Sequence, residues 1–65
     1  MGTMKQVHER RIGRLVIETH IYEDGYIHAA LLDEFGLEIA SLDGHERSGQ
    51  TRGLIEDHLY DQHGE

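Results

Sequence analysis

The sequence contains no cysteine, no proline and no tryptophan, and it has a single phenylalanine. The lack of cysteine excludes the disulfides that stabilise small secreted domains and any cysteine-based zinc site. No run approaches the roughly 20 apolar residues that a membrane-spanning helix needs, and nothing resembles a targeting signal. We therefore expect a cytoplasmic protein. A chain of 65 residues allows one domain with a small core, so it should be very regular, oligomeric or stabilised by a partner.

Basic side chains are scarce and unevenly distributed. Residues 1–14 carry a net charge of +3, residues 47–65 carry −2, and residues 15–46 carry −8 without a single lysine or arginine. The overall charge of −7 disfavours nucleic acid and anionic membranes as partners. The acidic stretch is either a solvated surface that maintains solubility or a face that binds a basic protein.

Residues 15–22 and 26–32 are rich in β-branched and aromatic residues, which predicts two strands. The connection is either a two-residue loop at Asp24 and Gly25 or a three-residue loop that includes Glu23. The three-residue loop places Ile21 opposite Ile27 and Ile17 opposite Leu31, with these apolar side chains on one face. The hydrophobic pattern therefore favours the three-residue loop.

The same pattern continues downstream with the three-residue loop Glu34–Gly36 and a strand over residues 37–42 that ends at Asp43 and Gly44. This register pairs Leu31 with Ile39 and adds Leu37 and Ile39 to the core face. Residues 15–42 are thus predicted to form a three-stranded antiparallel β-meander.

A helix is predicted at about residues 50–62, capped by Thr51 or Ser48. Its inward-facing stripe comprises Leu54, Ile55, His58, Leu59 and Gln62. Residues 1–14 are interpreted as a basic arm or an extra short element. The predicted fold is a single α+β domain over residues 1–65, with the meander followed by one C-terminal helix packed on one face of the sheet.

The second face of the predicted sheet is partly apolar, whereas an open antiparallel sheet usually has one polar face. Its larger apolar residues form a candidate dimer face: Val16, Tyr22, Tyr26, Leu32 and Leu42. Either a second copy or another protein covers this face, or residues 1–14 fold over it.

Six histidines raise the question of a metal site. His20 and His28 lie opposite each other in the favoured register, and together with Glu18 they can hold Zn²⁺. Pairing of two exposed histidines across the strands is the simpler interpretation, so neither metal nor cofactor is expected. The sequence also lacks a nucleophile motif and a glycine-rich phosphate loop, and it does not predict an enzyme.

In size and charge the chain is similar to small phage-encoded inhibitors of host defence, including anti-CRISPR proteins that mimic DNA. The resemblance rests on the acidic stretch 15–46 and implies a non-enzymatic inhibitor whose partner is a CRISPR–Cas effector or another basic nucleic-acid-binding protein. The carboxylates that would imitate phosphates are Glu18, Glu23, Asp24, Asp33, Glu34 and Glu38.

Two other interpretations remain. The predicted order of three strands and a helix, with the turn Glu23–Gly25, is similar to antitoxin domains of the HicB type, which implies a dimer that neutralises a basic toxin. A homodimeric structural or adaptor protein would instead use the partly apolar face. Direct nucleic-acid binding by the cluster of Arg10, Arg11 and Arg14 is disfavoured, because no aromatic stacking platform accompanies it.

Overall fold

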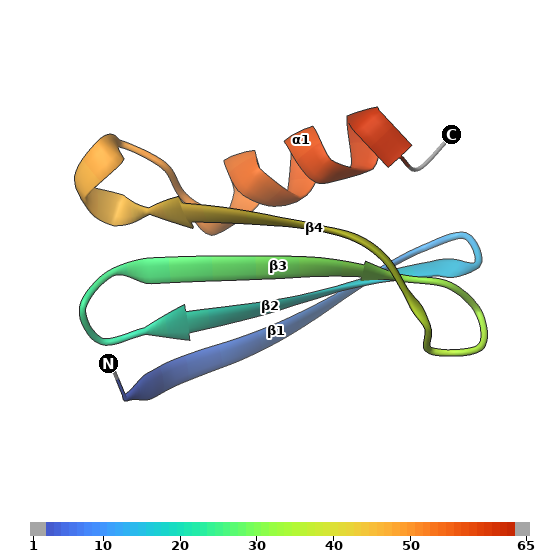
Figure 1. Cartoon of the computed structure of the whole chain (residues 1–65), viewed down its shortest axis with the longest axis horizontal. Helices are drawn as coiled ribbons and strands as arrows, with labels where there is room; N and C mark the ends of the chain where they lie inside the picture. Colours follow the sequence, from blue (N-terminus) through green and yellow to red (C-terminus); the bar gives the residue numbers. More distant parts are fainter. Residues whose placement is uncertain (1–2, 64–65) are drawn as a thin grey trace.

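The computed structural model describes residues 3–63, which form a four-stranded antiparallel sheet with one helix packed against it (Figure 1). The strands lie in the sheet in sequence order: β1 (Met4–Ile12), β2 (Leu15–Tyr22), β3 (Tyr26–Leu32) and β4 (Glu38–His45). A 3₁₀ turn, η1 (Glu46–Ser48), leads to α1 (Arg52–His63), which contacts β4, β3 and β2. The α+β class and the C-terminal helix are confirmed, whereas the prediction of three strands is wrong.

The extra strand comes from the predicted basic arm, whose first two residues lie outside the described part of the chain. β1 pairs with β2 along almost its whole length, with Gln6 opposite Ile21 and Arg10 opposite Ile17. Gly13, with φ of 61°, forms part of the turn between the two strands. A strand of this kind is held by main-chain hydrogen bonds and needs few apolar side chains. Its sequence therefore carries little hydrophobic signal.

The predicted register of β2 and β3 is confirmed. Ile21 lies opposite Ile27, and His20 lies opposite His28. The three-residue turn closes through a hydrogen bond from the Gly25 amide to the Tyr22 carbonyl at 3.0 Å, with Gly25 at φ of 95°. A left-handed residue at this position is what a type I turn followed by a bulge requires.

The predicted register of β3 and β4 is wrong beyond the loop. The main chains of Asp33 and Leu37 pair as expected, but Leu31 lies opposite Ala40 instead of Ile39 because of a β-bulge. One extra residue reverses the face of every side chain that follows. Ile39, the extra residue of the bulge, is consequently 50% exposed. Leu37 precedes the bulge, but it lies at the end of the sheet and is 65% exposed, so neither residue joins the core.

β4 also continues through Asp43 and Gly44, where the sequence predicts its end. Gly44 faces the helix, and a Cβ atom there would overlap the Ile55 Cδ1 atom and lie 2.8 Å from the Gln50 Oε1 atom. Glycine is thus required by close packing and not by a turn.

The helix begins one residue after Thr51, whose hydroxyl accepts a hydrogen bond from the Leu54 amide at 3.3 Å. Thr51 is therefore the N-cap, one of the two candidates that the sequence offers, while Ser48 lies in η1. The predicted stripe is only partly correct, because Ile55 and Leu59 are buried but Leu54 is 58% exposed.

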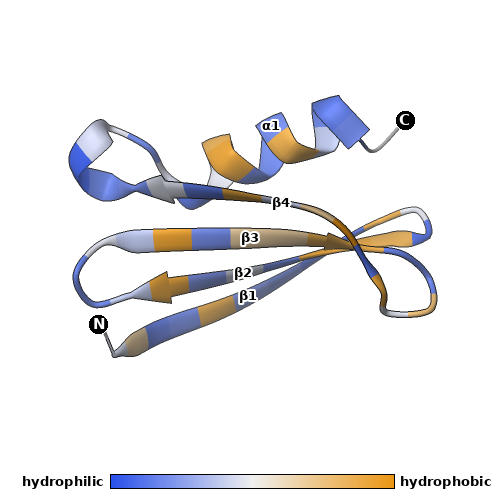
Figure 2. Ribbon diagram, in the orientation of Figure 1, coloured by the Kyte–Doolittle hydropathy of each residue, from blue (hydrophilic) through white to orange (hydrophobic). Residues whose placement is uncertain are grey.

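The core lies between α1 and the face of the sheet that it covers. Every second residue of β2 and β3 is buried, so that one side of each strand supplies the core, and Figure 2 shows hydrophobic stretches on β3 and on α1. The buried apolar cluster consists of Ile17, Ile21, Ile27, Ala29, Leu31, Ile55 and Leu59.

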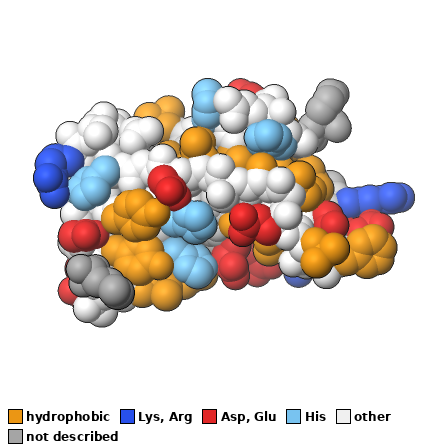
Figure 3. Space-filling model, viewed as in Figure 1, with side chains coloured by type: hydrophobic (Ala, Val, Ile, Leu, Met, Phe, Trp, Pro, Cys, Tyr) orange, Lys and Arg blue, Asp and Glu red, His pale blue; other side chains and the backbone are white. Residues whose placement is uncertain are grey.

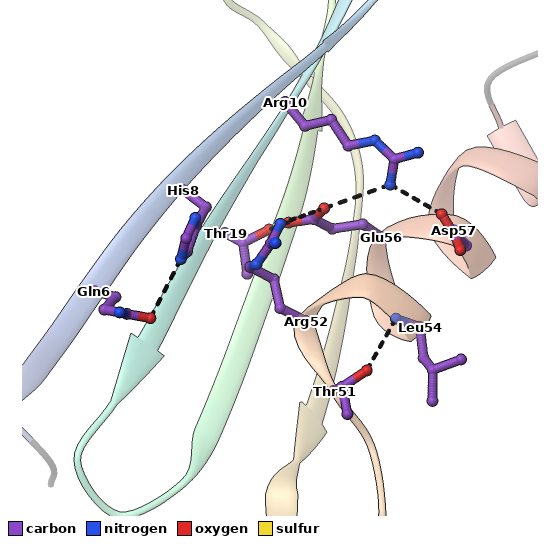
Figure 4. A network of polar contacts seen from close by, with 9 residues as sticks. All are labelled: Gln6, His8, Arg10, Thr19, Thr51, Arg52, Leu54, Glu56 and Asp57. Atoms are coloured by element: carbon purple, nitrogen blue, oxygen red, sulfur yellow. Dashed lines mark hydrogen bonds and ion pairs between the residues drawn. The ribbon is translucent and has the colours of Figure 1, made fainter.

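One carboxylate, Glu56, is fully buried in this interface, although the sequence places it off the inward stripe. The hydroxyl of buried Thr19 donates a hydrogen bond to Glu56 at 2.5 Å, and Arg52 Nη1 lies 2.9 and 3.0 Å from its two oxygens. Arg10 approaches from β1 at 3.6 Å (Figure 4). The charge is therefore paired and hydrogen-bonded, which is what makes its burial tolerable.

Candidate functional site

The predicted partner-binding carboxylates form two groups at opposite ends of the sheet, because successive turns of a meander alternate between its ends (Figure 1). Glu23 and Asp24 lie in the turn between β2 and β3. Asp33, Glu34 and Glu38 lie in or beside the loop between β3 and β4. The structure does not bring these five residues together into one patch.

Glu18 lies between these two groups, on the side of the sheet that α1 leaves uncovered. We call this side the open face. From β2, β3 and β4 it carries Val16, Glu18, His20, Tyr22, Tyr26, His28, Ala30, Leu32 and Asp43. No helix or strand formed by residues 3–63 covers it. The predicted carboxylates thus mark both ends and the middle of the sheet.

The arginines closest to the helix bind carboxylates of α1 and not those of the acidic stretch 15–46. Arg10 donates a hydrogen bond to Asp57 at 2.9 Å and also approaches Glu56, while Arg52 binds Glu56 (Figure 4). The hydrogen bond to Asp57 is the main cause of the raised pKa of Arg10. The positive charge contributed by β1 is therefore partly balanced by α1.

The carboxylates of residues 15–46 remain largely without basic partners as a result. Seven of these eight side chains are exposed, and Asp33 is half-buried. Within residues 3–63, a single lysine or arginine nitrogen lies within 4.0 Å of one of them, Arg14 Nε at 3.9 Å from Glu34. The acidic stretch predicted from the sequence is accordingly an uncompensated acidic surface in the folded chain.

A row of histidines and carboxylates crosses the open face. His20 Nε2 lies 3.5 Å from Glu18 Oε1, and His28 Nδ1 contacts Asp43 Oδ1. His20 and His28 are directly opposite across β2 and β3. Figure 3 shows two neighbouring histidine side chains on this face, beside hydrophobic and acidic ones. Each histidine therefore has its own carboxylate.

Tyr26 joins this row at the end of β3. The Tyr22 and Tyr26 rings are 5.5 Å apart between centroids and tilted by 35°. The pKa of Tyr26 is raised, first by partial desolvation of its hydroxyl group and then by hydrogen bonding to Asp43 and the charge of that carboxylate. The sequence did not single out Asp43, because its face depends on the bulge in β4.

The predicted dimer face is retained except for one residue. Val16, Tyr22, Tyr26 and Leu32 lie on the open face, since their positions alternate with the buried residues of β2 and β3. Leu42 lies on the other face, opposite Ala29, where it packs against the core. The bulge between the loop and β4 moves Leu42 there, so its assignment to the dimer face is wrong.

The end of the sheet near Arg14 contains an open groove of about 420 Å³. Val16 and Leu32 contribute apolar walls. The charged lining residues are Glu9, Arg11, Arg14, Asp33 and Glu34, three acidic and two basic. Arg11 lies 3.7 Å from Glu9, so these charges largely face one another and leave the groove slightly acidic.

The loop between β3 and β4 carries a feature that the sequence prediction missed. Phe35, Leu37 and Ile39 are 79%, 65% and 50% exposed, although Leu37 and Ile39 were expected in the core. We call these three residues the loop tip. The available sequence signal was Phe35 itself, a large apolar residue inside a three-residue turn.

Searches of protein-family models, curated proteins and solved structures found no match to the chain. Within the described residues, no three or more histidine, aspartate or glutamate side chains are grouped so that they could hold a metal ion. No helix of the described chain is both long and apolar enough to cross a membrane.

Proposed function

We propose that the chain is a non-enzymatic protein-binding inhibitor. Its acidic surface occupies the nucleic-acid-binding site of a basic partner such as a CRISPR–Cas effector. The observation that carries the proposal is the division of charge. Arg10 and Arg52 pair with the carboxylates of α1, whereas the lysines and arginines of residues 3–63 make one contact within 4.0 Å to the eight carboxylates of residues 15–46, from Arg14 to Glu34. A surface of this kind attracts a groove lined by lysine and arginine.

The dimensions of the molecule support the same proposal. Its longest extent is 31 Å, close to one turn of B-DNA, which is about 34 Å. Carboxylates lie at the two ends of the sheet, and Glu18 lies between them on the open face. A groove that binds several successive phosphates can meet these charges along the length of one sheet.

Displacement of DNA tests the proposal. Fluorescently labelled DNA is bound to purified basic nucleic-acid-binding effectors, CRISPR–Cas effectors among them, and the chain is titrated in. We expect the wild-type chain to displace the DNA from at least one effector. A triple variant with Glu23→Lys, Glu34→Lys and Glu38→Lys should lose this ability, because it reverses charge at both ends of the sheet.

The control is Asp61→Lys, which reverses an exposed charge on α1. It should retain displacement apart from the modest effect of net charge. The proposal is wrong if no effector releases its DNA, or if the triple variant displaces DNA as well as the wild-type chain does.

A homodimer is the second candidate, because four of the five predicted dimer-face residues share the open face. β1 extends the sheet at its edge instead of folding over that face. Sedimentation velocity at two concentrations tests it: a dimer would sediment faster at the higher concentration, and Leu32→Glu would abolish the change. A monomer at both concentrations would exclude this candidate.

A further inference from the structure

The loop tip concentrates apolar surface at one end of the molecule. Seven large hydrophobic residues are exposed in the described chain, and three of them, Phe35, Leu37 and Ile39, fall within five consecutive positions. Figure 3 shows hydrophobic and acidic side chains together at this end. A large aromatic side chain at 79% exposure contributes little to the fold and is free to pack against another surface.

The loop that presents Phe35 and Leu37 is braced by Asp33, and Ile39 follows in β4. The Asp33 Oδ1 atom accepts hydrogen bonds from the amides of Phe35 at 2.8 Å and Leu37 at 2.9 Å. The Asp33 carbonyl accepts another from Gly36, and the Asp33 amide donates to the Leu37 carbonyl. An apolar group fixed in this way loses little conformational freedom when it binds.

The charges around the tip indicate what kind of surface it can meet. Asp33, Glu34 and Glu38 flank it, and among the described residues Arg14 is the one arginine or lysine within 4.0 Å of these carboxylates, at 3.9 Å from Glu34. A second copy of the chain is a poor binding partner for the loop tip, because the groove next to the tip is slightly acidic and each chain carries a net charge of −7. An apolar pocket rimmed by lysine and arginine is complementary in both respects.

We propose that Phe35 and Leu37 form an apolar anchor that inserts into such a pocket beside the nucleic-acid-binding groove of the basic partner. This inference rests on the proposed function for the nature of the partner. The carboxylates would bring the two proteins together, and the anchor would slow their separation. Buried aromatic residues at the centre of an interface dominate binding in this manner.

Two serine substitutions provide a matched test. Phe35→Ser removes the anchor, whereas Leu54→Ser removes an exposed apolar side chain from α1, where Leu54 is 58% exposed. Affinity is measured for the effector from which the wild-type chain displaces DNA. Phe35→Ser should weaken binding by about 30-fold, mainly through faster dissociation, and Leu54→Ser should leave it within about twofold.

Both variants should keep the wild-type melting temperature, since both side chains lie outside the core. Phe35→Met, which retains an apolar side chain, should restore most of the affinity. Equal affinities for Phe35→Ser and the wild-type chain would overturn the inference, even if DNA displacement itself is observed.

Photo-crosslinking separates failure of the anchor from failure of the proposed function. p-Benzoylphenylalanine replaces Phe35 in the full chain inside the host cell, and crosslinked peptides are mapped. Crosslinks to an apolar segment bordered by lysine or arginine on another protein support the anchor, even if that protein binds no nucleic acid. Crosslinks to a second copy of this chain, or none from position 35, overturn it.

Discussion

The two faces of the sheet are built from alternate residues of the same strands, yet they differ in almost every property. The face under α1 is largely apolar, and the carboxylate that α1 buries against it, Glu56, is paired and hydrogen-bonded. The open face mixes the Tyr22 and Tyr26 rings with histidines and exposed carboxylates. The residues that stabilise the fold therefore lie on one side of a thin sheet, whereas the other side carries aromatic and titratable side chains that the core does not use.

The largest effect is expected from the adjacent pair Leu31 and Leu32, which point to opposite faces. Leu31 is fully buried, so Leu31→Ala should cost about 3 kcal/mol, a large part of the roughly 3–10 kcal/mol expected for a chain of this length. Leu32 is half-buried on the open face, and Leu32→Ala should cost less than about 1 kcal/mol. Urea denaturation measures both, and equal losses would mean that the open face contributes as much as the core.

The buried carboxylate gives the next largest effect. Glu56→Ala should destabilise the fold by about 2 kcal/mol, because it removes the partner of Arg52 and leaves the buried Thr19 hydroxyl unsatisfied. Glu38→Ala, at an exposed position in β4, should change stability by less than about 0.5 kcal/mol. Thermal denaturation compares them, and an unaffected Glu56→Ala variant would contradict the structural role given to this network.

Two glycines on the helix side should respond in opposite directions. Gly44→Ala should cost about 1–2 kcal/mol, since the added methyl group meets Ile55 and Gln50 in the core. Gly53 lies in α1 with nothing within 4 Å of an added Cβ atom, so Gly53→Ala should stabilise by about 0.5–1 kcal/mol. Melting temperatures measure the two changes, and a stabilising Gly44→Ala would show that α1 is packed less closely than described.

The smallest effect is expected on stability at high pH, where Tyr26 on the open face loses its proton. The pKa of Tyr26 is raised in the folded chain, so the folded state holds this proton more tightly than the unfolded state, in which tyrosine titrates at about 10. The resulting stabilisation is complete below that pH and is lost as the pH rises through the raised pKa of Tyr26.

Tyrosinate absorbance measures this titration, and Tyr26→Phe identifies the contribution of Tyr26 among the three tyrosines. Asp43→Asn should lower the pKa of Tyr26, since it removes the neighbouring charge, although partial desolvation of the hydroxyl group still raises it. No change in Asp43→Asn would show that Asp43 does not influence Tyr26.

The sequence predicted those parts of the fold that depend on side-chain pattern. The apolar positions around Ile21 and Ile27 were sufficient to set the register of β2 and β3. The hydroxyl residues Thr51 and Ser48 likewise indicated that α1 begins near residue 50, and Thr51 is the one that caps it. These features depend on the hydrophobicity or hydrogen-bonding capacity of individual side chains, which can be read from the sequence.

The parts that were missed depend on main-chain geometry or on distant partners. A single bulge opposite Leu31 and Leu32 places Leu42 and Ile39 on other faces of the sheet than the sequence predicts. No residue type in the loop indicates this bulge. β1 is held by main-chain pairing, and the burial of Glu56 depends on Thr19 and Arg52 from separate elements. For the candidate site, the sequence identified the acidic stretch 15–46, but it did not predict that its carboxylates divide between the two ends of the sheet.

The salt dependence of effector binding tests whether the sheet carboxylates carry the interaction. We compare the wild-type chain, the triple variant Glu23→Gln, Glu34→Gln and Glu38→Gln, and the helix variant Asp61→Asn. The affinity of the wild-type chain should fall steeply as salt rises, the triple variant should show a clearly shallower slope, and Asp61→Asn should keep the wild-type slope. Equal slopes for the wild-type chain and the triple variant would contradict the assignment of recognition to the acidic ends of the sheet.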